Sequence, residues 1–188
     1  MLIVAISVPG LAGSGGVYEM SIFENPTTFN IFSSTGPQAT VWNDFTSSSQ
    51  YYTSLYELAE PYLTFVPAVA ADMPSDLKQE KIGGNTYYTS IVKLRKDIKW
   101  SNNTPLTADD VVFSYNAVLD MDPNKLGGNW PSLVDPTVLV RAEKVDDYTV
   151  KFILTEKPGL AQWQYGILQS YLLNKNYWEP VFAKAKAA

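Results

Sequence analysis

The segment from Tyr87 to Trp100 constrains the fold most, because its side chains alternate over nearly its whole length. Val92 and Leu94 fall on one face, while Lys93 and Arg95 fall on the other. A period of two with one charged face is typical of a strand in a sheet that has one side in water. The sequence therefore predicts a sheet that contains this strand and has one solvent-exposed face.

Turn residues beside this strand and further along the chain predict two hairpins. Gly83-Gly84-Asn85 precede the strand and favour a tight turn. Asp146-Asp147 separate two alternating runs, Val138–Val145 and Tyr148–Leu154, and so predict a second hairpin. Val17–Ile22 alternates as well and is expected to form a strand near the N-terminus.

A helix is predicted from Thr107, which is a favourable N-cap residue, with Asp110 at the spacing of a capping box. Asp120 is the expected end, because Pro123 follows closely. The helix presents one apolar stripe at helical spacing. Its members are Val111, Tyr115, Val118 and Leu119.

The remaining segments carry weaker patterns. Thr40–Leu58 is rich in aromatic residues; its first part could be helical, and the part around Leu55-Tyr56 could be extended. Tyr62–Ala71 contains Pro67 and favours an irregular or edge segment. Pro158–Leu173 is predicted to be helical or mixed, and Asn174–Ala188 to be a final helix.

Composition excludes several kinds of chemistry. The 188 residues include no cysteine and no histidine, so disulfides, thiolate nucleophiles, zinc–thiolate sites and histidine bases are absent. An enzyme would have to use carboxylates, lysine, serine or tyrosine. The net charge of −5, without a long basic run, argues against nucleic acid as a partner. Aromatic residues make up 13% of the chain and could build a core or line a binding cleft.

The N-terminus is typical of an export signal. Met1–Val8 is almost entirely apolar, and small residues follow to Gly16, as in the cleavage region of a secretory signal peptide. Residues 1–16 are therefore expected to be the remnant of such a signal, with a buried N-terminal strand as the alternative. Leu11–Ser14 resembles the lipidation motif of exported lipoproteins, but Ser14 stands where the lipid-bearing cysteine would be.

Three segments, in this order and spacing, resemble a known family. One is Thr89–Tyr115, in which a strand leads through a polar turn to a helix start. Its matching residues are Pro105, Leu106, Thr107, Ala108, Asp110, Val111 and Phe113. Another is Ser54–Glu57, followed by Val66-Pro67 and Ala70–Asp72. The third is Val145–Leu154, with Glu156–Pro158 after it.

Together these segments resemble the family 5 extracellular solute-binding proteins, the dipeptide- and oligopeptide-binding class, over roughly residues 17–180. The resemblance implies a mixed α/β fold of the type II periplasmic-binding-protein class. Family members are longer and have a second lobe that this sequence does not include. Residues 17–188 are thus expected to be the N-terminal part of the first lobe, which is incomplete here.

The resemblance also implies a function. The chain would belong to a receptor that binds a small-molecule or peptide solute in the periplasm or at the outer face of the cell membrane. It would deliver that solute to the membrane permease of an ABC transporter. Dipeptides, oligopeptides, sugars and nickel complexes all remain possible ligands, although a bare nickel ion is disfavoured without histidine.

By the same resemblance, the loop after the first strand and the aromatic segment after it approach the ligand. The candidate ligand-binding residues are Phe29, Asn30, Trp42, Tyr51, Tyr52 and Tyr56. Flat apolar rings with hydroxyl and amide groups suit a peptide or a sugar. The alternative for each aromatic residue is packing in the core, and for Asn30 it is a loop cap.

Two other functions stay open. One is a stand-alone carbohydrate- or peptide-binding module, which the aromatic content permits. The other is a glycosidase, which needs two carboxylates roughly 5–10 Å apart across a cleft. The sequence offers no such pair in a recognisable context, and no catalytic residue, metal site or cofactor is predicted. Asp109 and Asp110 are neighbours on a helix and do not share a face, so capping explains them better than metal binding.

Overall fold

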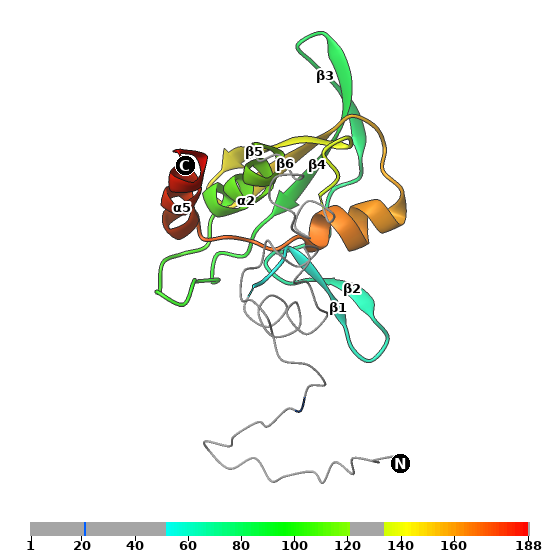
Figure 1. Ribbon diagram of the computed structural model, residues 1–188. Coiled ribbons are helices and arrows are strands. Elements are labelled where there is room, and N and C mark those ends of the chain that lie inside the picture. The colour runs from blue at the N-terminus through cyan, green and yellow to red at the C-terminus, as the bar shows by residue number, and fades with distance from the viewer. Residues whose placement is uncertain (1–20, 22–51, 121–133, 188) are drawn as a thin grey trace, which may run out of the picture.

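The computed structural model describes Ser21 and residues 52–120 and 134–187 of the chain. These residues form a mixed α/β fold with a four-stranded sheet, a separate two-stranded hairpin and helices (Figure 1). Helix α2 (Ala108–Asp120) lies against the sheet, and α5 (Lys175–Ala187) packs against α2. The strand expected at Val17–Ile22 lies outside the described residues, except for Ser21.

The larger sheet is built from two antiparallel hairpins. The first hairpin contains β3 (Lys78–Ile82) and β4 (Asn85–Lys93), and the second contains β5 (Leu139–Asp146) and β6 (Thr149–Leu154). Antiparallel pairing of β4 with β6 joins them, so the strand order is β3-β4-β6-β5. Figure 1 shows β3 and the adjacent end of β4 projecting away from the rest of the sheet.

Both predicted hairpin turns are confirmed. Gly83 and Gly84 form a two-residue loop with φ angles of 58° and 88°. Tight hairpin turns with two positive φ angles match the twist of the strands and favour glycine. At the other turn, the Asp146 carboxylate accepts a hydrogen bond from the backbone N–H of Tyr148 at 2.8 Å.

The strand predicted over Tyr87–Trp100 is shorter than expected, because β4 ends at Lys93. Lys93 pairs with Thr149, which is the first residue of β6, so the partner strand begins only there. The next backbone N–H, of Leu94, donates to the carbonyl of Tyr148 in the turn, at 2.8 Å. Beyond Lys93 the chain makes isolated bridges, Leu94 with Ala70 and Lys99 with Pro105, in place of a continuous ladder.

The segment around Leu55-Tyr56 is extended, which is one of the conformations expected there. It forms β1 (Tyr56–Ala59), which pairs with β2 (Thr64–Pro67) in the two-stranded hairpin. Pro67 is the last residue of β2, at an edge where its missing N–H costs no ladder hydrogen bond.

The predicted mixed segment and the predicted final helix are confirmed. A π-helix, η2 (Ala161–Gly166), is followed by a 3-10 turn, η3 (Ile167–Gln169). An extended stretch, residues 170–174, then leads into α5. Asn174 caps that helix, because its side-chain oxygen accepts from the backbone N–H of Tyr177 at 3.2 Å.

Helix α2 begins where the capping box predicts. The Asp110 carboxylate accepts a hydrogen bond from the backbone N–H of Thr107 at 3.0 Å, which is the reciprocal half of such a box. In the predicted apolar stripe, Val111 and Tyr115 are buried and Leu119 is half-buried, while the side chain of Val118 is not among those described.

Two polar side chains of α2 hold the chain that leads into α5. The second oxygen of Asp110 accepts from the backbone N–H of Lys175 at 2.9 Å. The hydroxyl of Ser114 accepts from the backbone N–H of Leu173 at 2.7 Å and donates to the carbonyl of Asp110 at 2.6 Å. Asp110 is only 6% exposed and Ser114 only 1%, so these bonds satisfy groups that water reaches poorly.

The core lies between one face of the sheet, α2 and the η2–η3 segment. The Phe152 ring of β6 meets the Tyr115 ring edge-on at 4.8 Å and the Trp163 ring edge-on at 5.8 Å, measured between centroids. The largest fully buried side chains of this core are Leu55, Tyr56, Leu106, Tyr115, Leu139, Phe152, Leu154, Ile167, Leu168, Leu172 and Leu173.

Replacing Asp110 by alanine should lower the free energy of unfolding by roughly 1–3 kcal/mol, because two backbone N–H groups lose their acceptor. Urea denaturation measures this loss. Asp109→Ala is the matched control: its side chain is 50% exposed and pairs with Lys144, so its removal should cost less than about 1 kcal/mol. Equal losses for the two variants would contradict the role given to Asp110.

Candidate functional site

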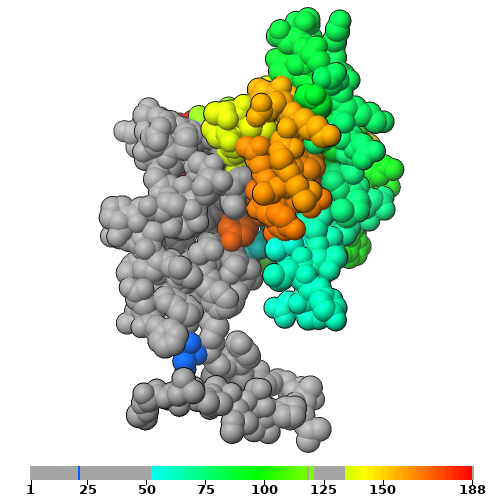
Figure 2. Space-filling view, turned by 90° about the vertical axis from the view of Figure 1, so that its right-hand side faces the viewer, coloured from blue at the N-terminus to red at the C-terminus, as the bar shows by residue number. Residues whose placement is uncertain are grey.

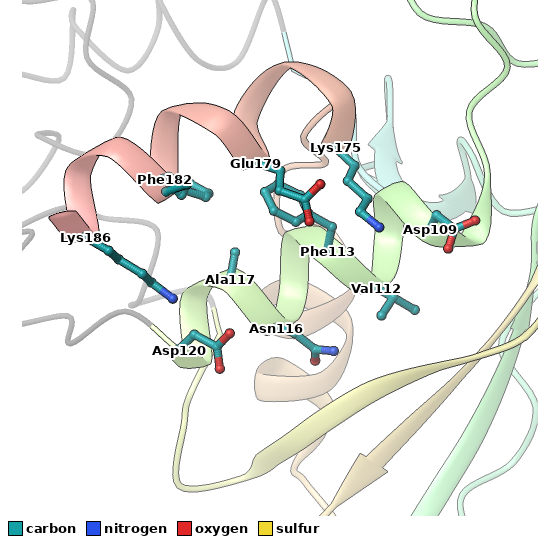
Figure 3. A pocket seen from close by; sticks show the side chains of 11 residues that line it. Asp109, Val112, Phe113, Asn116, Ala117, Asp120, Lys175, Glu179, Phe182 and Lys186 are labelled. Carbon is teal, nitrogen blue, oxygen red and sulfur yellow. The ribbon is translucent and has the colours of Figure 1, made fainter.

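Two hollows open on the surface of the described residues, and they differ in chemistry. The first lies in the seam between α2 and α5 and encloses about 350 Å³. Its apolar floor includes the Phe113 and Phe182 rings, whose centroids are 5.7 Å apart. Figure 3 shows Lys175 and Glu179 near one end of the seam and Asp120 and Lys186 near the other. Charges of both signs therefore surround this groove.

The second hollow, which we call the tyrosine pocket, encloses about 360 Å³. It lies where the chain entering β1 meets the η2–η3 segment, and Figure 2 shows these two parts, cyan and orange, side by side on one face. Its lining residues are Tyr52, Thr53, Ser54, Glu57, Tyr165, Gln169 and Tyr171.

The backbone of two distant segments builds this pocket. The N–H of Leu172 donates to the carbonyl of Thr53 at 2.8 Å, which fixes residues 170–174 beside the chain that enters β1. Ser170 and Leu172 are buried at 1% and 0% exposure. Because side chains alternate along an extended chain, Tyr171 between them points the opposite way, to the pocket.

A buried tyrosine of α2 holds the other wall. The Tyr115 hydroxyl donates to the carbonyl of Ile167 at 2.6 Å, and Tyr115 is only 1% exposed. Burial, followed by the nearby Tyr56, raises the pKa of Tyr115 well above its ordinary value of 10. The hydroxyl therefore remains a donor at neutral pH and anchors η3, which carries Gln169.

Aromatic rings supply most of the pocket's apolar surface. The Tyr52 and Tyr171 rings lie 6.0 Å apart at an angle of 44°, and Tyr165 is 46% exposed. Burial, with a smaller contribution from Tyr177, raises the pKa of Tyr52, so its hydroxyl is neutral at physiological pH. Such rings can stack on a flat or aliphatic ligand group.

Three polar side chains of the pocket keep an oxygen acceptor free. The Ser54 hydroxyl donates to the carbonyl of Tyr56 at 2.6 Å, and the Gln169 amide N–H donates to the carbonyl of Gln164 at 3.0 Å. Glu57 is exposed, and its carboxylate forms no ion pair or hydrogen bond with any residue in the described part. A ligand would therefore meet oxygen acceptors at Ser54, Glu57 and Gln169, beside the hydroxyls of the lining tyrosines.

The six predicted ligand-binding residues fall into three groups. Tyr52 lines the tyrosine pocket. Tyr56 does not: it is 0% exposed, stacks on Phe65 at 4.8 Å, and donates its hydroxyl to the carbonyl of Asp72 at 2.8 Å. The burial of Tyr56 matches the core-packing alternative. The others, Phe29, Asn30, Trp42 and Tyr51, lie outside the described residues.

The sequence interpretation missed Tyr165, Gln169 and Tyr171, which complete the pocket. They follow β6 in the chain, in a segment whose secondary structure stayed undecided. The only available signal was the alternation around Tyr171 between Ser170 and Leu172, which is too short to recognise without its partner segment.

No metal site is present in the described ranges, since these residues contain no group of three or more acidic side chains that could hold an ion. Asp109 forms an ion pair with Lys144 at 2.6 Å, and Asp110 caps α2. The capping interpretation is therefore confirmed for Asp110, whereas Asp109 pairs with a lysine of β5. The helices described here include none that is both long and apolar enough to cross a membrane.

Comparison with known proteins assigns the family. Residues 64–186 match the family described as bacterial extracellular solute-binding proteins, family 5. The chain is 32% identical, over 133 residues, to the dipeptide-binding protein of Escherichia coli (strain K12). This alignment covers 62% of the chain and 24% of that protein, so the chain spans about a quarter of the length of its curated relative.

Solved structures agree with this assignment. The oligopeptide-binding protein of Bacillus subtilis, determined with a nonapeptide, is 27% identical with a TM-score of 0.58; the match covers 84% of this chain and 28% of that one. A dipeptide-binding protein of Pseudoalteromonas sp. SM9913 shares the fold at 19% identity and a TM-score of 0.61, over 87% of this chain and 32% of that one. The described fold is thus part of a periplasmic-binding-protein fold. The chain belongs to the family 5 bacterial extracellular solute-binding proteins.

The buried tyrosines behind the pocket should make stability sensitive to alkali. Burial also raises the pKa of Tyr56 above 10, with a smaller effect from Asp72. Because Tyr56 and Tyr115 ionise more readily when unfolded, their stabilising contribution is complete below about pH 10 and is lost as the pH rises further. As the pH is raised from neutral to 11, the denaturation midpoint of Tyr115→Phe should therefore decrease less than that of the unmodified protein.

Tyr62→Phe provides the matched control, because Tyr62 is 87% exposed and its ring packs against no core. This control should reproduce the pH dependence of the unmodified protein. Identical slopes for Tyr115→Phe and the unmodified protein would contradict the assignment of Tyr115 as a neutral buried donor.

Proposed function

We propose that this chain is part of a receptor that binds a peptide-like solute outside the cytoplasm and delivers it to the permease of an ABC transporter. The observation that carries the proposal is the family match over residues 64–186. Residues 17–188 would form the N-terminal part of the first of two lobes, and residues 1–16 would be the remnant of an export signal. The relatives named above bind dipeptides and a nonapeptide, which supports a peptide-like ligand.

The tyrosine pocket supports binding rather than catalysis. Tyr52 and Tyr171 offer aromatic faces, and Gln169 offers an amide that can orient a ligand. Glu57 is the only carboxylate in the lining, so the two-acid arrangement of a glycosidase has no counterpart within this pocket. We therefore propose that the receptor makes and breaks no covalent bond.

Delivery would follow the hinge closure that is common to two-lobed receptors. One lobe holds the solute first, and the second lobe closes over it and excludes water. The pocket is open in this lobe, with Tyr165 46% exposed, so its rings are accessible to a ligand before closure. Closure would then strengthen each polar contact by removing competing water.

A stand-alone carbohydrate- or peptide-binding module is the second candidate. One observation favours it: three aromatic side chains, Tyr52, Tyr165 and Tyr171, line the tyrosine pocket. Aromatic rings with hydroxyl groups also suit sugar rings. Specific binding of equal strength by the 188-residue chain and by the product of the complete reading frame would favour the module over the two-lobed receptor.

The product of the complete reading frame should be stabilised against heat by at least some members of a panel of di- to nonapeptides. A ligand at a hundred times its Kd adds about 2.7 kcal/mol of stability. Tyr171→Ala should weaken binding by more than about 1 kcal/mol, as expected for a central aromatic contact. Calorimetric titration measures this change.

Tyr62→Ala is the control, because this exposed tyrosine lies outside the pocket lining. The affinity of this variant for the peptides should match that of the unmodified protein. Absence of stabilisation by every peptide and by an accompanying oligosaccharide panel would overturn the receptor proposal. Hydrolysis of any panel member would support the glycosidase or another enzyme instead.

A further inference from the structure

We infer that the tyrosine pocket selects solutes that carry a positively charged ammonium or guanidinium group and disfavours anionic ones. The inference rests on the proposed solute-binding function and adds the charge of the ligand group that this pocket accepts. Three independent features of the lining support it: its charge, its unused hydrogen-bonding groups and its aromatic faces.

The charge of the lining has one sign. Among the described residues that line it, Glu57 is the only carboxylate, and none is a lysine or an arginine. By contrast, the groove between α2 and α5 contains Lys175 and Lys186 as well as acidic residues. A single carboxylate at the mouth of a hollow attracts a cation and repels an anion, and both effects grow as the ligand displaces water.

The carboxylate of Glu57 is also available. Glu80 and Glu143 are already paired, with Lys151 at 2.6 Å and with Arg141 at 2.7 Å. Glu57 has no such partner among the described residues. Glu156 is unpaired in the described part as well, but it lines neither of the two hollows. Glu57 thus combines a free carboxylate with a position in a pocket.

The other polar groups favour a ligand that is rich in donors. The N–H of Gln169 and the hydroxyl hydrogen of Ser54 are committed to backbone carbonyls, at 3.0 and 2.6 Å. The amide oxygen of Gln169 and the lone pairs of Ser54 are left to accept. An ammonium group has three donors and a guanidinium group has five, and neither has an acceptor. Such groups match this arrangement better than a carboxylate does.

The rings complete the match. Tyr52 and Tyr171 lie 6.0 Å apart at 44°, and Tyr165 adds a third aromatic side chain to the lining. A cation over the face of a tyrosine is attracted by the ring's electron density, so the tyrosine rings and the Glu57 carboxylate in this lining both favour a cation. The aliphatic stem of a lysine or arginine side chain would also contact these rings.

The test compares three tripeptides of equal length in calorimetric titrations with the product of the complete reading frame: Ala-Lys-Ala, Ala-Ala-Ala and Ala-Glu-Ala. Each is also used in N-acetylated form, which separates a ligand's terminal ammonium from its side chain. We expect the lysine peptide to bind roughly tenfold more tightly than the glutamate peptide. Added salt should reduce this preference, since Glu57 is exposed.

Glu57→Gln keeps the shape of the side chain and removes its charge. This variant should reduce the charge preference to within about twofold. Glu156→Gln makes the same change on an exposed residue outside the pocket and should leave the preference intact. Thermal unfolding midpoints equal to that of the unmodified protein would show that both variants are folded.

The outcomes separate the inference from the function on which it rests. If the peptides bind but their affinity is independent of charge, or if Glu57→Gln keeps the preference, the inference is wrong and the receptor function stands. If none of the six peptides binds, the inference is overturned, whereas the receptor function is overturned only if the peptide and oligosaccharide panels described above also fail. An equal loss of affinity by all three peptides on acetylation would support recognition of the terminal ammonium, and a lysine preference that persists after acetylation would support recognition of a basic side chain.

Discussion

The fold depends on how the extended stretch at residues 170–174 is held, because none of the four strands of the main sheet pairs with it. Side chains and a loop carbonyl take the place of a partner strand. Ser114 accepts from the N–H of Leu173, and Thr53 accepts from the N–H of Leu172, at 2.7 and 2.8 Å. The Asp110 carboxylate then accepts a hydrogen bond from the first backbone N–H of α5. This stretch thereby ties α2, the chain entering β1 and α5 into one body.

The same bonds explain why the segment that most resembles the family lies outside the proposed ligand site. Asp110 and Thr107 belong to the segment that resembles the family most closely, and both act in helix capping. Ser114, one turn later, completes the connection to α5. Family membership is therefore visible in residues that maintain the fold, whereas function depends on the residues of the site.

The tyrosine pocket is a consequence of this framework. Leu172 turns inward and Tyr171 outward on the held stretch, and Tyr115 secures the opposite wall through the carbonyl of Ile167. Rigid support of this kind limits the conformational entropy that the pocket loses when a ligand binds. Glu57 adds a charge without a partner in the described part, so the shape and the charge of the pocket come from different residues.

Local pattern alone determined the two hairpins, the start of α2 at its capping box, the final helix and the resemblance to the family, because turn and cap chemistry depend on neighbours in the sequence. The end of β4 at Lys93 was decided by where β6 begins, which is a matter of pairing between distant segments. Tertiary structure likewise placed Tyr56 in the core and Tyr52 at the surface, although both are tyrosines of the same aromatic segment. It also brought Tyr165, Gln169 and Tyr171 to Tyr52. Contacts between residues more than a hundred positions apart leave no local pattern, so only the folded chain could reveal this pocket.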